Sequence, residues 1–556
     1  MPAILYERNA YDTSGPRLVG LQAANRQFLD ALVSDERLDE LGCYTAEEKD
    51  FDTFCTMIKP TKPSKKTIAR ILYGDHAGLS RAGVLHRYDP IITSYLWQRR
   101  SVDQRLYSVT GMIHSISSRP IMEAIGGLVV APLQPWDALI CTSRSGHKAV
   151  TTILSNWADY LAQRFNARPN LSIKLPIIPL GLDCDAFDAG SDTADIRGKT
   201  RAQLGIRDQD IAVLFVGRLS FKRKCHPVPM YLALQQAQKA TGARVHFIQA
   251  GQFEDEREEE AFRAAAAQFC PDVRSLVVGG KQLFRDQGVW FAGDIFLSLS
   301  DNIQETFGLA PVEAMAVGLP VVVADWDGYR DTVREGIDGF RIPTTMPSPT
   351  AGRDVAERYH QFGNYRHYYG TVAMSTAVDV DACADVLARL IRDPALRHRM
   401  GQSGRERART TYDWRTVLNA YHQLWGVLGE ARRSADTVAP LLHGGPPYPL
   451  CDDPFRVFER YASRTIAPDT ALSLGRLADL EQLRGSWMTH FGAEWRADRE
   501  TASAILHRIA QHRTMTVAEI ADGLDTPDAR LQRTIVYMLK FGLLRTSNGP
   551  EASREL

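Results

Sequence analysis

Residues 304–320 read Gln304-Glu305-Thr306-Phe307-Gly308-Leu309-Ala310-Pro311-Val312-Glu313-Ala314-Met315-Ala316-Val317-Gly318-Leu319-Pro320. They predict a short apolar helix, because Pro311 suits a first helical turn, Gly318 suits the residue after the last turn and Pro320 prevents continuation. Residues 321–324, which are Val-Val-Val-Ala, then predict a buried strand. A helix this short and apolar is not a surface helix, so we expect its N-terminus to face a ligand.

The chain on both sides of this stretch alternates between expected strands and helices. Such alternation is typical of a parallel sheet covered by helices, and it predicts an α/β fold. The expected strands, apart from the one at 321–324, lie at residues 91–95, 106–113, 137–143, 211–216, 243–250 and 293–299.

Two glutamates stand eight positions apart in the opening stretch, Glu305 before the turn and Glu313 in the helix. A helix N-terminus offers free N–H groups and partial positive charge, which suit an anion such as phosphate. The simplest interpretation is a solvated Glu305 and a Glu313 that interacts with the helix charge. With its flanking residues, however, the pattern resembles the Glu-x7-Glu signature of retaining GT-B glycosyltransferases, specifically glycosyltransferase family 4. The resemblance implies that Glu305 lies beside the donor sugar and that Glu313 holds the ribose hydroxyls of the nucleotide.

The resemblance also implies an organisation into two Rossmann-like lobes. We expect an N-terminal acceptor lobe over residues 1–190, a nucleotide-sugar donor lobe over 195–412, and a helix over 413–433 that returns to the first lobe. The polar stretch 185–210 predicts the linker between the lobes. Residues 345–372, rich in Tyr, His and Arg, predict an insertion in the donor lobe.

A cationic turn follows the apolar strand expected at residues 211–216. Residues 217–227 read Gly-Arg-Leu-Ser-Phe-Lys-Arg-Lys-Cys-His-Pro. Ligands of α/β proteins bind at the carboxyl ends of parallel strands, and Arg and Lys both suit phosphate oxygens. A solvated basic turn is the alternative. In family 4 a Gly-Arg-Leu followed by a lysine holds the donor diphosphate, so the resemblance implies this role for Arg218 and a lysine, with Lys224 favoured over Lys222.

The expected chemistry requires the diphosphate to leave as an anion. Positive groups aimed at its developing charge lower the barrier. We expect Arg218, Lys224 and the N–H groups of the turn Phe307, Gly308 and Leu309 to converge there. No metal or other cofactor is then expected, and the donor is a nucleotide-diphosphate sugar.

Two further features bear on this mechanism. Asp325-Trp326-Asp327 has the letters of a metal-binding Asp-x-Asp motif, but it leads from a strand into a loop and a helix start, which does not favour a metal. The resemblance implies retention of anomeric configuration, by attack on the same face with the diphosphate acting as base.

Two positions in the first lobe complete the predicted site. His114 ends the strand expected at 106–113 and resembles the family histidine near the donor sugar, with a structural histidine as the alternative. The loop from Gly15 to Gly20 would approach phosphate or acceptor, because glycine lets the backbone come close. It departs from the common Gly-Gly-x-Gly form, so acceptor geometry is the least transferable part of the resemblance.

Composition sets the remaining bounds. The 556 residues suggest three or four domains, and 66 basic against 66 acidic residues give no overall attraction to nucleic acid or anionic membrane. Eight cysteines without a Cys-x-x-Cys pair indicate neither a zinc ribbon nor a redox motif. The N-terminus lacks a signal-peptide core, and no stretch is long and apolar enough to span a bilayer. These features predict a cytoplasmic protein, with peripheral membrane contact left open and with a glycan, lipid or small-molecule acceptor.

Extra chain follows a Gly- and Pro-rich linker at residues 444–449 and lies outside the resemblance. Residues 434–500 predict a linker and a helical segment. Residues 501–556 are similar to a winged-helix module. It has three expected helices and a strand, and Thr516 and Thr526 are expected helix N-caps.

A nucleic-acid-binding or regulatory protein on a GT-B scaffold is therefore the alternative function. The third expected helix exposes Arg530, Arg533 and Lys540, but residues 500–556 are nearly charge-balanced, which argues against nucleic acid and favours a protein partner. A GT-B phosphorylase is disfavoured because it would have no ribose for Glu313 to recognise.

Overall fold

The computed structural model describes residues 1–13, 20–59, 66–279, 288–436, 438, 446, 448–477, 480–483 and 486–547. It divides into two compact units, Met1–Tyr448 and Pro449–Leu556, which are described separately. Residues 15–19 of the predicted glycine loop and residues 444, 445 and 447 of the predicted linker lie outside the described ranges.

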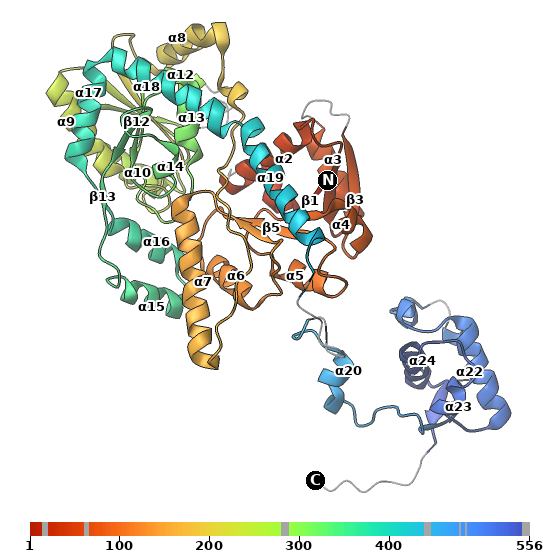
Figure 1. The fold of residues 1–556 in the computed structure, drawn as a ribbon. Helices are drawn as coiled ribbons and strands as arrows, with labels where there is room; N and C mark the ends of the chain where they lie inside the picture. The colour runs from red at the N-terminus through yellow and green to blue at the C-terminus, as the bar shows by residue number, and fades with distance from the viewer. Residues whose placement is uncertain are drawn as a thin grey trace. The chain divides into compact units, whose positions relative to one another are not determined.

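The first sheet of the larger unit has six parallel strands in the order β3-β2-β1-β4-β5-β6. Helices cover it, as Figure 1 shows in red and orange. The strands are β1 (Pro2–Leu5), β2 (Glu40–Thr45), β3 (Thr67–Leu72), β4 (Val84–His86), β5 (Ser108–Met112) and β6 (Ala138–Ile140). The helices are α1 (Arg8–Tyr11), α2 (Gly20–Ser34), α3 (Glu48–Ile58), α4 (His76–Ala82), α5 (Thr93–Arg100), α6 (Arg119–Gly127) and α7 (Arg144–Phe165).

The strand predicted at residues 91–95 is wrong, because α5 begins there. The Asp89 carboxylate accepts the N–H of Ile91 at 2.8 Å, which turns the chain. The carbonyl of Ile92 then accepts the N–H groups of Tyr95 and Leu96, and Ile92 and Leu96 are both fully buried. Helical i, i+4 burial therefore outweighs the β-propensity of the isoleucines.

The second sheet also has six parallel strands, in the order β12-β11-β10-β7-β8-β9. Its strands are β7 (Ile211–Val216), β8 (Val245–Ala250), β9 (Arg274–Val278), β10 (Ile295–Ser298), β11 (Val321–Ala324) and β12 (Gly339–Ile342). Its helices include α8 (Thr193–Leu204), α9 (Pro227–Thr241), α10 (Glu256–Phe269), α12 (Gly288–Ala292), α13 (Leu309–Val317), α14 (Tyr329–Thr332), α17 (Val380–Arg392) and α18 (Pro394–Arg407). Two doubly wound sheets confirm the predicted α/β fold of two Rossmann-like lobes.

The prediction that residues 185–210 form only a linker is wrong. Helix α8 lies inside this stretch and packs on α12 of the second lobe. Its Arg201 is buried and bonds to the Asp294 carboxylate at 3.1 Å and to the carbonyl of Ala292 at 3.0 Å. A buried arginine paired with Asp294 fixes this helix to the lobe, so the polar composition here includes a buried ion pair.

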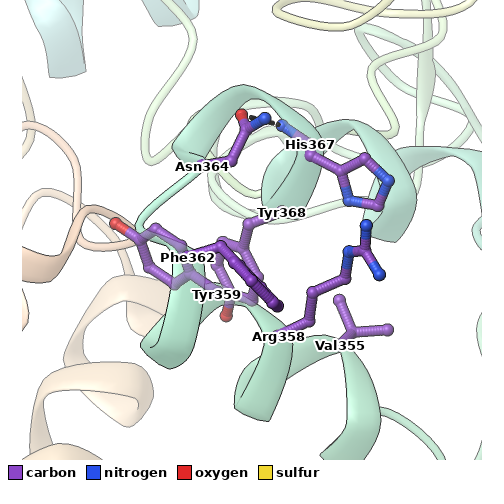
Figure 2. A pocket seen from close by; sticks show the side chains of 7 residues that line it. All are labelled: Val355, Arg358, Tyr359, Phe362, Asn364, His367 and Tyr368. Carbon is purple, nitrogen blue, oxygen red and sulfur yellow. Dashed lines mark hydrogen bonds between the residues drawn. The ribbon is translucent and has the colours of Figure 1, made fainter.

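The predicted insertion is a helical hairpin between β13 (Thr344–Thr345) and β14 (Ala377–Val378). Its helices are α15 (Arg353–Phe362) and α16 (Tyr365–Met374), and Figure 1 shows them beside the first-lobe helices α6 and α7. A small cavity of about 210 Å³ lies within the hairpin. Figure 2 shows the aromatic, arginine and histidine side chains around it.

Helix α19 (Trp414–Arg433) crosses back to the first lobe and packs against α2. The rings of Tyr421 and Phe28 lie 4.9 Å apart, and the Tyr421 hydroxyl bonds to the sulfur of Met112 at 3.2 Å. His422 Nε2 lies 2.7 Å from the Asp35 carboxylate. The two lobes are thus tied by this helix as well as by the chain between them.

The smaller unit has a three-stranded antiparallel sheet, in the order β16-β15-β17, packed with helices. Its elements are α20 (Pro454–Val457), β15 (Ala471–Leu474), α21 (Trp487–His490), α22 (Arg499–His512), β16 (Met515–Thr516), α23 (Val517–Ala521), α24 (Asp528–Lys540) and β17 (Leu544–Thr546). Thr516 caps α23 in a capping box with Glu519, as predicted. Thr526 does not cap α24, because that helix begins at Asp528 with Pro527 as its N-cap.

The cations of α24 contact the chain's own backbone. Arg533 donates to the carbonyl of Trp495 at 2.7 Å, and Arg530 donates to that of Arg496 at 3.3 Å. Two of the three cations on which the nucleic-acid alternative depended thus each donate one hydrogen bond within the smaller unit. No helix in the described ranges of either unit has the length and apolarity needed to cross a bilayer.

Candidate active site

Helix α13 begins at a turn that only glycine fits. Gly308 has φ +88°, and a Cβ there would lie 2.0 Å from the Tyr329 ring. The Tyr329 ring is fully buried, and its hydroxyl lies 3.0 Å from Ser298 Oγ at the end of β10. Gly318 ends the helix at φ +96°, as predicted. The N-terminus of α13 is therefore fixed at the carboxyl edge of the second sheet, beside β10.

The cationic turn after β7 meets the Glu305 motif. Lys224 Nζ bonds to Glu305 Oε2 in an ion pair whose side chains are 14% and 18% exposed. Burial lowers the pKa of Lys224, but the Glu305 carboxylate and the Tyr329 hydroxyl raise it well above its ordinary value overall. The structure thus brings together Lys224 and Glu305, which are 81 residues apart in the chain.

The other cations of this turn differ in their surroundings. Arg218 makes no hydrogen bond or ion pair with any residue that the structure describes. Arg218 lies exposed, two residues after the end of β7. Desolvation and the charge of Arg223 lower its pKa, and the Glu305 carboxylate opposes them. Arg223 instead donates to the Tyr369 hydroxyl at 3.0 Å and pairs with Glu254 at 2.9 Å. Arg218 is therefore a cation available to an incoming anion, and Arg223 supports the turn.

Lys222 lies exposed, with Nζ 5.0 Å from the centre of the Phe221 ring. Of the two lysines, only Lys224 pairs with Glu305, and the role of either lysine toward phosphate stays a prediction.

Glu313 is half-buried on α13 and has no hydrogen-bond or ion-pair partner among the described residues. Burial raises its pKa to about 7, and the Lys224 charge lowers it in part. A partly buried carboxylate without a donor is costly unless a ligand supplies one. Its acceptor oxygens are thus free for hydroxyl groups.

Phe307 and Leu309 flank Gly308 in this turn. Phe307 is buried, and its ring lies 5.8 Å from that of Tyr412. Leu309 opens α13, so its N–H is one of those left free by the helix geometry.

His114 brings the first lobe to the same place. Its backbone carbonyl accepts a hydrogen bond from Thr306 Oγ1, the residue after Glu305. Its ring Nε2 is buried without a hydrogen-bond partner in the described part of the chain. Burial lowers the pKa of His114 to about 4, so the imidazole is neutral and can donate or accept one hydrogen bond.

Gly20 does not join this cluster through any contact with the described residues. It is the exposed first residue of α2, and open space surrounds the position a Cβ would take. Its predicted role depends on the rest of a loop that lies outside the described ranges.

Two acids at strand ends have raised pKa values, and the sequence analysis considered only Asp327 of the two, as part of an Asp-x-Asp motif. Asp301 follows β10, and its Oδ2 accepts the N–H of His226 at 3.2 Å, while burial raises the pKa of Asp301 to about 7. Asp327 follows β11 with φ +42°, and burial beside Glu305 raises its pKa well above the ordinary value. Its carboxylate lies 3.5 Å from Ser143 Oγ of the first lobe. An acid just after a buried strand was the signal that could have identified Asp301.

The Asp-x-Asp letters at 325–327 do not form one cluster. Asp325 pairs with Arg341 at 3.4 Å and Arg330 at 3.6 Å, whereas Asp327 faces Ser143. Within the described ranges, no three His, Cys, Asp or Glu side chains gather as a metal site would require.

A family of known proteins matches part of the second lobe. Residues 196–353 match the sequence model of the family described as "Glycosyl transferases group 1". This region holds Arg218, Lys224, Glu305 and Glu313.

Similar proteins carry related names. A D-inositol 3-phosphate glycosyltransferase of Geodermatophilus obscurus is 29% identical over 240 residues, which are 41% of this chain and 50% of the relative. A phosphatidyl-myo-inositol mannosyltransferase of Mycobacterium leprae is 24% identical over 343 residues, covering 60% of this chain and 71% of the relative. The chain spans about half the length of the first of these relatives.

Among solved structures, the Anabaena protein Alr3699/HepE in complex with UDP aligns with 77% of this chain and 100% of its own, at 16% identity and a TM-score of 0.49. The fold assignment rests on the strand orders of the two sheets rather than on this alignment. Residues 196–353 are therefore similar to group 1 glycosyltransferases, and they lie within a scaffold of two doubly wound α/β lobes.

Proposed function

We propose that this chain transfers a sugar from a nucleotide-diphosphate sugar to a hydroxyl group of an acceptor, with retention of anomeric configuration. The observation that carries the proposal is the convergence of the Lys224–Glu305 pair, the unpaired Arg218 and the α13 N-terminus at one edge of the second sheet. A diphosphate needs cations and free N–H groups, and this edge supplies both.

Each residue has a distinct role in the proposal. Arg218, Lys224 and the N–H groups of α13 hold the diphosphate, and Glu313 accepts hydrogen bonds from the ribose hydroxyls. Glu305, held by Lys224, lies beside the donor sugar, and the neutral His114 completes the sugar's surroundings from the first lobe.

The bond changes follow from this arrangement. The acceptor oxygen forms a bond to the anomeric carbon on the face from which the diphosphate leaves. The bond between that carbon and the diphosphate oxygen breaks, its electron pair goes to the diphosphate, and the acceptor proton passes to the same oxygen. Arg218 and Lys224 stabilise the negative charge that develops, so the chain's own cations suffice without a metal.

Relatives' names guide the choice of acceptor. Two of them name an inositol phosphate or a phosphatidylinositol, so inositol-bearing alcohols are the first acceptors to test.

The test is a thermal-shift panel of nucleoside diphosphates and nucleotide sugars, followed by measurement of nucleoside diphosphate release. A ligand at a hundred times its Kd stabilises the folded state by about 2.7 kcal/mol. We expect Glu313→Ala to lose this response, and Glu305→Gln to keep it while losing turnover.

Glu260→Ala is the matched control, because Glu260 is an exposed glutamate of the same lobe on α10. If Glu313→Ala and Glu305→Gln both behave like Glu260→Ala, the proposed function is wrong.

A further inference from the structure

Apart from its first residue, Arg353, the hairpin of α15 and α16 lies beyond the family match, and it contacts residues next to both Glu305 and His114. Tyr365 is the first residue of α16. Its hydroxyl oxygen lies 2.8 Å from Ser117 Oγ in the first lobe and 2.9 Å from Gln304 Nε2 in the second. One hydroxyl therefore joins the two lobes, accepting from the Gln304 amide and sharing a hydrogen bond with Ser117.

The two partners of Tyr365 stand next to proposed site residues. Gln304 directly precedes Glu305, and Ser117 lies three residues after His114. A second hairpin tyrosine, Tyr359, accepts the backbone N–H of Arg119 at 2.8 Å. The loop that carries His114 is thus held by the hairpin at two points.

The hairpin tyrosines are themselves well supported. The Tyr365 ring meets that of Tyr369 edge-on, with centroids 4.9 Å apart, and the Tyr369 hydroxyl accepts from Arg223 of the cationic turn. The rings of Tyr359 and Tyr368 stack with centroids 4.5 Å apart at an interplanar angle of 14°. Figure 2 labels both side chains. Locked rings hold a hydroxyl in one place, which is what a positioning group requires.

We infer that Tyr365 is a positioning residue whose hydroxyl sets the spacing between Glu305 and His114 across the site. The expected effect of Tyr365 on turnover rests on the proposed function. The hydrogen-bonded bridge from Gln304 to Ser117 does not depend on that function. Phenylalanine keeps the ring packing and removes only the bridge.

The variants are Tyr365→Phe, Ser117→Ala and the double mutant. Tyr368→Phe is the matched control, because it is a hairpin tyrosine whose hydroxyl makes no hydrogen bond with the described residues. Each lost hydrogen bond is worth about 1 kcal/mol, so Tyr365→Phe, which loses two, is expected to lower kcat by up to about thirtyfold. KM for the donor changes little, because the proposed nucleotide contacts of Arg218 and Glu313 are untouched. The double mutant is expected to match Tyr365→Phe, since Ser117 acts through the same hydroxyl.

Hydrogen exchange provides a readout that needs no turnover. Tyr365→Phe should speed amide exchange in residues 114–119 and 304–306, whereas Tyr368→Phe should not. If the parent protein turns over no nucleotide sugar but this exchange still rises, the proposed function fails and the bridge stands. If exchange is unchanged, or if Tyr365→Phe and Tyr368→Phe have equal kcat in an active parent, the inference is overturned.

Discussion

The Glu313 carboxyl should make donor binding depend on pH. In the free protein, burial raises its pKa to about 7, so it is largely protonated at pH 6. Accepting hydrogen bonds from two ribose hydroxyls favours the charged form, so the donor binds the ionised carboxylate and binding releases a proton. The affinity for the donor should therefore rise with pH, and it should level off above the pKa that Glu313 has in the free protein.

The size of the effect follows from that pKa. A group with a pKa of about 7 is ionised in roughly one molecule in eleven at pH 6 and in roughly ten of eleven at pH 8. The predicted gain in affinity between these values is about tenfold, or about 1.4 kcal/mol. Because its pKa is raised, the protonated Glu313 carboxyl also stabilises the folded state at acid pH. This contribution to the free energy of unfolding declines as pH rises from the pKa of the carboxyl in the unfolded chain to about 7.

Titration calorimetry with a nucleotide-diphosphate sugar measures this directly, because such a donor has no phosphate that titrates near neutrality. Repeating the titration in buffers of different ionisation enthalpy counts the released proton. Glu313→Gln is the control, and it should bind with little dependence on pH. Asp301, whose pKa is also about 7, is unchanged in both proteins, so the difference between them isolates Glu313. An equal rise in Glu313→Gln, or an affinity that falls with pH in the parent, would refute the reasoning.

Three further predictions concern the same edge of the sheet. Gly308→Ala should destabilise the protein by about 2–5 kcal/mol, because the alanine would have a strained positive φ and a Cβ 2.0 Å from the Tyr329 ring. Gly318→Ala has the same strain but no atom closer than 3.8 Å to its Cβ, so it should cost about 1–2 kcal/mol. Equal losses of thermal stability in the two variants would contradict this prediction. Lys224→Met should lower turnover, measured as the rate of nucleoside diphosphate release, by about 10²–10³-fold. Lys222 is exposed, so Lys222→Met should lower turnover by less than about tenfold. A larger loss of turnover in Lys222→Met than in Lys224→Met would reverse the assignment. Turnover should persist in excess EDTA. If EDTA abolishes turnover and an added divalent cation restores it, the chain's own cations are not sufficient.

The sequence predicted those parts of the molecule that local rules determine. The apolar run at β7, the short helix α13 and its closing Gly318 all follow from propensity and capping, and the structure confirms each. The match over residues 196–353 confirms the predicted glycosyltransferase domain in that region. The individual roles of Glu305, Glu313, Arg218 and Lys224 remain proposals.

Other features depend on contacts between distant segments, which local patterns do not contain. Arg201 makes α8 part of the second lobe only because Asp294 lies beneath it, 93 residues later. The hydrogen-bond partners of Tyr365, Ser117 and Gln304, lie far from it in the sequence and are identified only in the folded structure. The choice between Lys222 and Lys224 likewise needed the position of Glu305.

The central claim is that the strand-end cations grip the diphosphate of the donor. The most direct test compares the affinities of a nucleoside diphosphate and the matching nucleoside monophosphate for the parent and for Arg218→Met. A charge-assisted hydrogen bond is worth about 1.5–3 kcal/mol, so the preference for the diphosphate should shrink by about tenfold to a hundredfold in the variant, while monophosphate binding changes little. An unchanged preference for the diphosphate would contradict the account.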